Sequence, residues 1–255
     1  MTTIAGFRQL TANLSEALQR IAEEPLIERE TDNYLASIRD IKSVDDFIGN
    51  DRVYRYAMKA FGLEEMTYAK AFIRRVLTEG IDDQQSFANR LADSRYRELA
   101  EAFNFARYGA TTTAFGRTQQ GTVDRYLNQT LEEQAGTTNE GVRLALYFQR
   151  KASSLTSPYS LLADRALLKV TQVALGLPAA TGALDIDRQA QLIEKKLNVS
   201  DFSSTEKLDK FLTRFVAMWD VENQTTAPQA SAFDTASFGI SVDLLGQVQH
   251  LARKR

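Results

Sequence analysis

Apolar side chains recur at intervals of three and four residues along almost the whole of this 255-residue sequence. That spacing lines them up along one face of an α-helix. The first such stripe consists of Phe7, Leu10, Leu14, Leu18 and Ile21. Only 4 Pro and 13 Gly interrupt the chain, and β-branched residues do not alternate as they would in strands. The sequence therefore predicts an all-α fold, with the segment 142–148, apolar on more than one face, at the centre of its core.

A short pattern recurs three times and predicts a repeated helical module. Each copy has an aromatic residue, an Asp just before a helix, an Arg close behind, and a helix that ends in Ala and a large apolar residue. The copies lie within 45–63, 86–103 and 157–177. Self-similarity of this kind is typical of folds built from one repeated helical unit. We therefore expect a multi-helix bundle assembled from repeated modules.

The recurring residues suit the two ends of a helix. An Asp at a helix start accepts hydrogen bonds from free N–H groups and lies at the positive end of the helix dipole, so we expect Asp51, Asp93 and Asp164 to act as caps. A Gly after the last turn can adopt the left-handed conformation that ends a helix. Gly62 and Gly176, each followed by Leu, fit that role. Repetition of this kind favours a structural purpose over a catalytic one.

The positions of the copies predict two related helical halves. Residues 1–110 form an N-terminal half with the first and second copies, and 111–137 form a connecting segment. Residues 138–222 form a C-terminal half with the third copy. Residues 223–255 begin with a stretch rich in Thr, Ala, Gln and Ser, which predicts a mobile linker before a short amphipathic helix.

That C-terminal helix is the candidate partner-docking segment. Its apolar face consists of Leu244, Leu245, Val248 and Leu251, together with Ile240. An amphipathic helix after a linker can bury its apolar face against another surface, and the protein's own N-terminal helix is one such surface.

Composition excludes several classes of function. The chain has 31 Lys and Arg against 33 Asp and Glu, whereas nucleic-acid binders usually carry a basic excess. No Cys is present, and the single His250 cannot supply a usual zinc or iron ligand set. No apolar run reaches the roughly 20 residues that span a bilayer, and the N-terminus lacks a cleavable signal pattern. We expect no metal, no cofactor, no nucleic acid and no membrane span, and a protein that is cytoplasmic or leaves the cell by a route that cleaves no signal.

Two spacings are shared with known enzymes, and both have a simpler interpretation. Tyr147 and Lys151 have the Tyr-x-x-x-Lys spacing of short-chain dehydrogenases, but the Gly-rich strand-to-helix turn of those enzymes is absent. An amphipathic helix with a solvated Lys is the expected arrangement. Ser204 and Lys207 have the Ser-x-x-Lys spacing of penicillin-interacting enzymes without their partner motifs, and capping explains Ser204 better. The sequence therefore predicts no catalytic residues.

The chain resembles an alphaproteobacterial family known only as a domain of unknown function (family 1217). The similarity lies in the strings 30–34, 43–47 and 57–63, with weaker similarity on to Trp219. Members of this family look like products of flagellar gene clusters, some of them labelled as basal-body components. The resemblance implies a flagellum-related role, with flagellar components as protein partners and a flagellum-associated location as the alternative to a cytoplasmic one. It carries no established binding residues.

Three hypotheses about function follow. The first is a non-enzymatic helical interaction protein of the flagellar apparatus. The second is a cytosolic regulator that binds a small molecule, which requires a pocket with a few convergent polar groups. The third is an enzyme in which two carboxylates converge in one cleft. The oligomeric state is open in all three.

Overall fold

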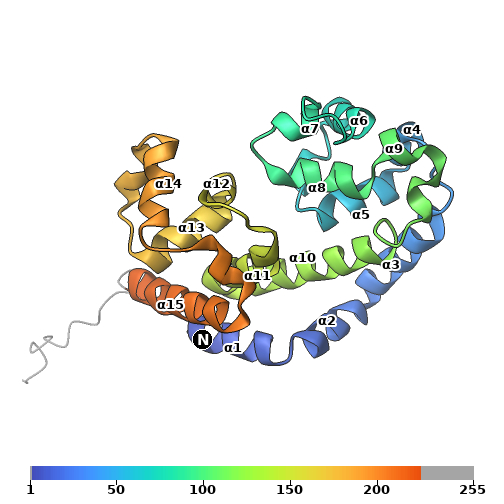
Figure 1. Ribbon diagram of the computed structural model, residues 1–255. Coiled ribbons are helices and arrows are strands. Elements are labelled where there is room, and N and C mark those ends of the chain that lie inside the picture. Colours follow the sequence, from blue (N-terminus) through green and yellow to red (C-terminus); the bar gives the residue numbers. More distant parts are fainter. Residues whose placement is uncertain (1, 225–255) are drawn as a thin grey trace, which may run out of the picture. The chain divides into compact units, whose positions relative to one another are not determined.

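The computed structural model describes residues 2–224 (Figure 1). Every regular element in this part of the chain is an α-helix or a 3-10 helix, which confirms the all-α prediction. Residues up to Asp220 form one compact unit. The predicted docking residues Leu244, Leu245, Val248 and Leu251, and His250 beside them, lie outside the described residues, so their role stays a prediction.

The chain begins with three consecutive helices. They are α1 (Thr3–Ala12), α2 (Leu14–Ala22) and α3 (Pro25–Ile38). Asn13 interrupts the first apolar stripe between α1 and α2, and Pro25 occupies the first turn of α3, where its missing N–H costs no hydrogen bond. Phe7 and Ile21 from this stripe are buried. The predicted stripe therefore faces the core, although two helices share it.

The repeated module appears as a short helix followed by a longer one. The short helices are α4 (Val44–Gly49), α7 (Phe87–Arg90) and α12 (Pro158–Leu162). The longer helices that follow them are α5 (Asp51–Ala60), α8 (Ser94–Ala102) and α13 (Arg165–Leu175). Each short helix packs on the long helix after it.

The predicted Asp caps are present in two of the three copies. The side chain of Asp93 accepts a hydrogen bond from the Arg95 backbone N–H at 3.0 Å, and Asp164 Oδ1 accepts from Ala166 N–H at 2.8 Å. In the first copy the prediction was wrong by one residue. Asn50 is the cap and accepts from Val53 N–H at 3.2 Å, while Asp51 is the first residue of the helix. Asn and Asp cap helices about equally well, so the tertiary structure decides which of the two adjacent residues takes the position.

The predicted glycine terminators are confirmed. Gly62 and Gly176 have φ angles of 68° and 60°, which an L side chain rarely adopts. Leu63 N–H donates to the Met58 carbonyl at 2.8 Å, and Leu177 N–H donates to the Gln172 carbonyl at 2.9 Å. These bonds close each helix as a Schellman motif.

A further helix packs beside the first and third copies. These helices are α6 (Lys70–Glu79) and α14 (Ile186–Glu194), and they contact α4 and α12, respectively. The contact between α4 and α6 corresponds to the contact between α12 and α14. The group α4, α5 and α6 therefore resembles the group α12, α13 and α14. The division of the chain into two related halves stays an interpretation.

Short helices connect these groups. The connecting elements are α9 (Phe105–Tyr108), η1 (Glu64–Met66), η2 (Gly109–Ala114), η3 (Ala152–Ser154), η4 (Ala179–Ala183) and η5 (Val199–Ser203).

Three more helices complete the described part of the chain. They are α10 (Gln120–Thr138), α11 (Glu140–Lys151) and α15 (Thr205–Gln224). Most of the segment 111–137 is thus helix α10, which packs against α2, α5 and α11. All of 142–148 except Arg143 is buried, which confirms its predicted place in the core.

A stack of tyrosine rings ties α3, α5 and α10 together. The Tyr56 ring lies 4.4 Å from that of Tyr34 and 3.9 Å from that of Tyr126, with nearly parallel planes. Tyr34 donates to the Thr118 carbonyl at 2.5 Å, and the hydroxyls of Tyr56 and Thr31 lie 2.9 Å apart. Such stacked aromatic pairs add stability beyond the area they bury. The stack therefore stabilises the packing of α3, α5 and α10.

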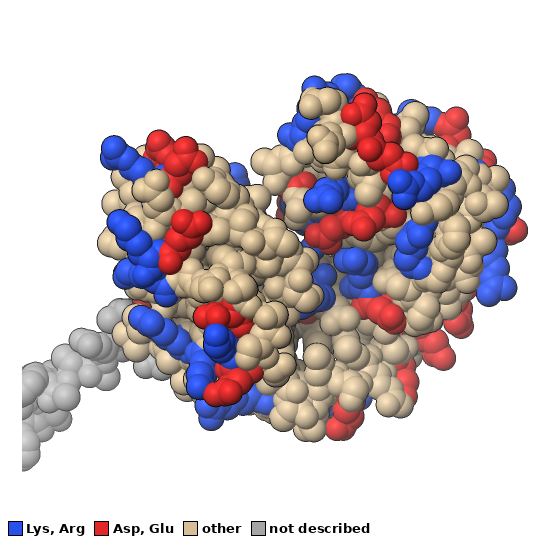
Figure 2. All heavy atoms as spheres, viewed as in Figure 1, with Lys and Arg blue, Asp and Glu red and all other residues tan. Residues whose placement is uncertain are grey.

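Charged side chains of both signs are mixed over the face shown in Figure 2. None of the described helices combines the length and the apolar character needed to cross a membrane.

Candidate functional site

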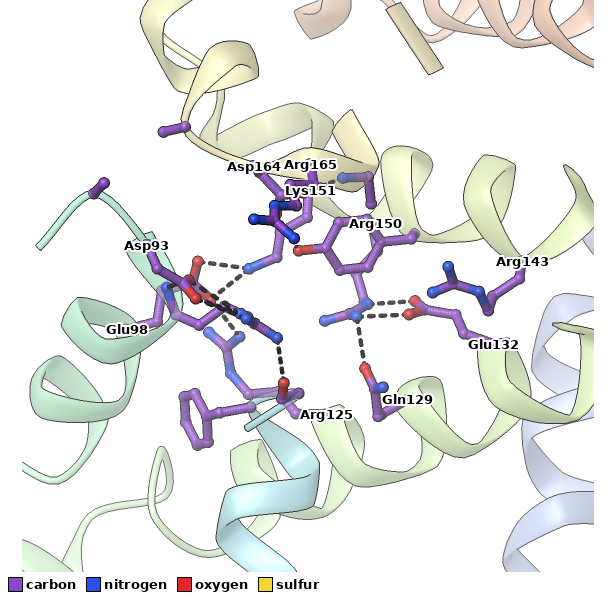
Figure 3. A pocket seen from close by; sticks show the side chains of 17 residues that line it. Asp93, Glu98, Arg125, Gln129, Glu132, Arg143, Arg150, Lys151, Asp164 and Arg165 are labelled. Atoms are coloured by element: carbon purple, nitrogen blue, oxygen red, sulfur yellow. Dashed lines mark hydrogen bonds and ion pairs between the residues drawn. The ribbon is translucent and has the colours of Figure 1, made fainter. Parts of the chain in front are cut away.

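A charged crevice lies where α8, α10, α11 and the start of α13 meet (Figure 3). Its volume is about 460 Å³. The charged residues that line it are Arg95, Arg125, Arg143, Arg150, Lys151 and Arg165, with Asp93, Glu98, Glu132 and Asp164. We call this site the charged crevice. It borders a second cavity of about 770 Å³, and the two share Glu98, Arg125, Arg150, Lys151, Ala163 and Asp164.

Glu98 is the centre of one side of the charged crevice. Lys151 Nζ lies 2.5 Å from Glu98 Oε1 and 2.6 Å from Oε2. Arg125 Nη1 approaches Glu98 Oε2 at 3.3 Å, and the Arg125 guanidinium lies 4.9 Å from the centre of the Phe61 ring. Glu98 thus joins α8 to both α10 and α11.

A second ion pair joins α10 to α11. Arg150 Nε and Nη2 donate to the two oxygens of Glu132 at 2.6 Å and 2.8 Å, in the forked arrangement that Arg and carboxylates prefer. The Glu132 side chain is only 4% exposed. A carboxylate this deeply buried must be paired to remain charged, so Arg150 is required for Glu132 to occupy the position.

Two more carboxylates, those of Asp93 and Asp164, lie at the starts of the helices that they cap. Asp93 accepts from Arg95 Nε at 3.0 Å, and Arg95 Nη1 also donates to the Gly62 carbonyl. Asp164 caps α13 through Oδ1, while its Oδ2 accepts from the Tyr147 hydroxyl at 2.5 Å. The module's capping Asp residues therefore also form part of the crevice wall.

Burial shifts the pKa of several of these groups. Burial lowers the pKa of Lys151 below the usual lysine value, although Glu98 acts in the opposite direction. Burial also raises the pKa of Tyr147 well above its ordinary value, and the nearby Asp164 charge raises it further. For Asp93, burial would raise the pKa, but hydrogen bonds from Arg95 outweigh it and the pKa is lowered. Tyr147 is therefore a neutral donor, and Asp93 stays ionised.

The chemistry that remains in the crevice is hydrogen-bond donation. All four carboxylates accept hydrogen bonds from neighbouring side chains, so none of them is an isolated base in an apolar pocket, the usual setting of a general base. Within residues 2–224, no three His, Asp or Glu side chains converge as a metal-binding group. Arg125, Arg150 and Arg165 keep side-chain N–H groups that no residue within 2–224 uses.

The structure corrects the interpretation of the Tyr147–Lys151 pair. Lys151 was expected to be solvated, but its side chain is only 10% exposed and lies in the crevice wall. The reason is its position on α11, three residues after the fully buried Phe148, which turns it toward the core. Lys207, from the other shared spacing, is exposed and pairs with Asp201 at 2.6 Å.

Sequence reasoning missed Glu98, Glu132 and Arg150. A signal for Arg150 was present, because Arg150 and Lys151 continue a helix that is apolar on more than one face. Charged residues on such a helix need buried partners. The partners could not be named, since Glu98 lies 53 residues from Lys151 in the sequence.

Comparisons with known proteins place the chain in a family. Residues 60–208 match the family model described as "Protein of unknown function (DUF1217)". The fold is also similar to an X-ray crystal structure of protein AGR_C_984 from Agrobacterium tumefaciens, a structural genomics target. That likeness has a TM-score of 0.82 and 46% sequence identity, and it covers 87% of this chain and 94% of the other. A comparison with curated proteins finds no match. The matched family model and this extensive similarity show that the chain belongs to the family of unknown function DUF1217.

Proposed function

We propose that this chain is a non-enzymatic helical interaction protein of the flagellar apparatus, acting in its assembly or at the basal body. The flagellar direction comes from what the family resemblance implies. The character of the surface supports an interaction role, and the state of the crevice carboxylates supports a non-enzymatic one.

The observation that carries the interaction role is a group of exposed apolar side chains on the neighbouring helices α12 and α14 and in the link between η4 and α14. We call it the α12–α14 patch. It consists of Tyr159, Leu184 and Ile186, which are 46%, 37% and 56% exposed. The Tyr159 hydroxyl donates to Asp187 at 2.8 Å, which holds the ring beside the start of α14. Exposed clusters of large apolar side chains mark protein contact sites, and Tyr is enriched among residues that dominate binding.

The non-enzymatic part of the proposal is supported by the ion pairs in the charged crevice. A general base must be free to take a proton from a substrate. Glu98 and Glu132 are instead each held by a Lys or Arg at 2.5–2.6 Å. Both carboxylates therefore join helices and are not free to act as a base.

The test is capture of partners from the native cell together with a motility assay. Ile186→Lys places a charge in the α12–α14 patch, and we expect it to reduce both the recovery of flagellar components and swimming. Leu26→Lys is the matched control, because Leu26 is 58% exposed and lies on α3, outside the patch. Normal swimming and flagella in a strain without the protein would contradict the proposal, as would capture of metabolic enzymes in place of flagellar parts.

A second candidate function is a regulator that binds a small molecule. The charged crevice favours it, since its volume of about 460 Å³ lies within the range of ligand pockets. Polar groups from four helices converge there, as a binding site requires.

A further inference from the structure

We infer that the charged crevice binds a small anion through carboxylate or phosphate oxygens, held by Arg125, Arg150 and Arg165. The inference deepens the second candidate function by naming its ligand class, and it is independent of the flagellar role.

The carboxylate acceptors of the crevice are already occupied. Both oxygens of Glu98 accept from Lys151, and both oxygens of Glu132 accept from Arg150. Asp164 uses one oxygen to cap α13 and the other to accept from Tyr147. A ligand rich in donors, such as an ammonium compound, would therefore find few acceptors to bind.

Guanidinium N–H donors remain free in the crevice. Arg150 uses Nε and Nη2 on Glu132 and leaves Nη1 without a partner among the described residues. Arg125 donates to Glu98 through Nη1 alone. Arg165, at the first position of α13, makes no hydrogen bond through its side chain within residues 2–224 and is exposed. These three guanidinium groups come from α10, α11 and α13, and all three line the same space in Figure 3.

Two of the three guanidinium groups are held in place by their neighbours. Glu132 fixes the Arg150 fork, and Glu98 and the Phe61 ring fix Arg125. A guanidinium that is already positioned loses little conformational freedom when a ligand arrives. Its planar fork matches the oxygens of carboxylates and phosphates. An oxygen-rich anion is therefore the ligand that satisfies the free donors.

The experiment is isothermal titration calorimetry of the full chain at low salt with two separate probes, inorganic phosphate and succinate. Succinamide, which is neutral and of similar shape, serves as the probe control. Arg165→Gln removes a donor that the fold does not use, so the variant keeps its stability. We expect it to weaken binding by about tenfold or more, the loss typical of one charge-assisted hydrogen bond. Arg188→Gln is the matched control, since Arg188 is exposed on α14 and does not line the crevice, and it should bind as the wild type does.

Saturable binding of either anion that is lost in Arg165→Gln and kept in Arg188→Gln supports the inference. The probe that binds more tightly then tells phosphate from carboxylate. Absence of binding of both anions at concentrations of about 10 mM, or equal loss in both variants, would overturn it. Equal binding of succinamide would also overturn the anion inference while leaving the second candidate function in place. None of these results depends on a flagellar partner.

Discussion

Lys151 and Glu98 are 53 residues apart in the sequence, yet the Lys151 ammonium lies 2.5 Å and 2.6 Å from the two carboxylate oxygens of Glu98. The pair joins the last turn of α11 to α8, and the Lys151 side chain is only 10% exposed. Together with the Arg125–Glu98 contact, it links the second module copy to the central helices. The contribution of this ion pair to the free energy of unfolding can be measured by substitution.

Lys151→Met should destabilise the fold by about 2 kcal/mol. The substitution leaves the half-buried Glu98 with only the longer contact to Arg125, so part of its desolvation cost is no longer offset. Urea unfolding followed by circular dichroism measures the change. Lys210→Met is the control, because Lys210 and Glu206 are both more than 70% exposed and such pairs contribute less than about 1 kcal/mol. Equal effects of the two substitutions would contradict the structural role given to Lys151.

Tyr147→Phe should cost about 1.5 kcal/mol of unfolding free energy, because it removes a hydrogen bond to the charged Asp164 inside the crevice. Tyr159→Phe removes a bond of the same chemistry, to Asp187, at an exposed position. Water replaces the lost donor there, so that variant should stay within about 0.5 kcal/mol of the wild type. Thermal unfolding of the two variants measures both losses. A larger loss of stability in Tyr159→Phe than in Tyr147→Phe would contradict the role given to the Tyr147–Asp164 hydrogen bond.

Asp93→Ala should destabilise the chain by about 1–2 kcal/mol at neutral pH, through loss of the cap on α8 and of the Arg95 contact. The folded pKa of Asp93 lies below its ordinary value of 3.8. The stabilisation linked to this shift is therefore complete above pH 3.8 and is lost as the pH falls through the folded pKa. The difference between wild type and variant should shrink at acid pH, as measured by urea unfolding at several pH values. A difference that stays constant down to pH 3, about one unit below the ordinary value, would show that ionisation plays no part.

Asp220→Ala should loosen the start of the chain. Asp220 on α15 accepts hydrogen bonds from the backbone N–H groups of Thr3 at 2.9 Å and Ile4 at 3.4 Å, and so caps α1 from a distant helix. Loss of a cap costs about 1 kcal/mol. Hydrogen exchange should speed up in α1 while α5 remains protected. Uniform acceleration over both helices would mean that Asp220 supports the whole fold and not this end of it.

Gly141→Ala should destabilise strongly, whereas Gly49→Ala should be neutral or slightly stabilising. A Cβ at position 141 would lie 2.6 Å from Trp219 Nε1 and 2.7 Å from Thr3 Cγ2, in a place where the backbone of α11 meets α1 and α15. Overpacking of this kind costs about 1–3 kcal/mol. A Cβ at position 49 meets nothing within 4 Å, and Ala favours helix more than Gly. Melting temperatures that fall equally in both variants would rule out the close approach at Gly141.

The sequence by itself determined the helical class and several helix ends, although not the break at Asn13 or the cap at Asn50. Helical periodicity, caps and glycine terminators are local properties, since they depend on residues within one or two turns of each other. That is why Asp93, Asp164, Gly62 and Gly176 could be assigned from the sequence, and why 142–148 could be placed in the core. Even the error at Asp51 is a shift of one residue between two good caps.

Only the tertiary structure decided which charged residues meet. The partners Glu98 and Lys151, and Glu132 and Arg150, belong to different helices, and their separation in the sequence contains no signal of contact. Whether a Lys is solvated or buried depends on what its helix packs against, so Lys151 was misjudged from local pattern alone. The crevice arises from the packing of α8, α10, α11 and α13 and could be found only once those helices were in place.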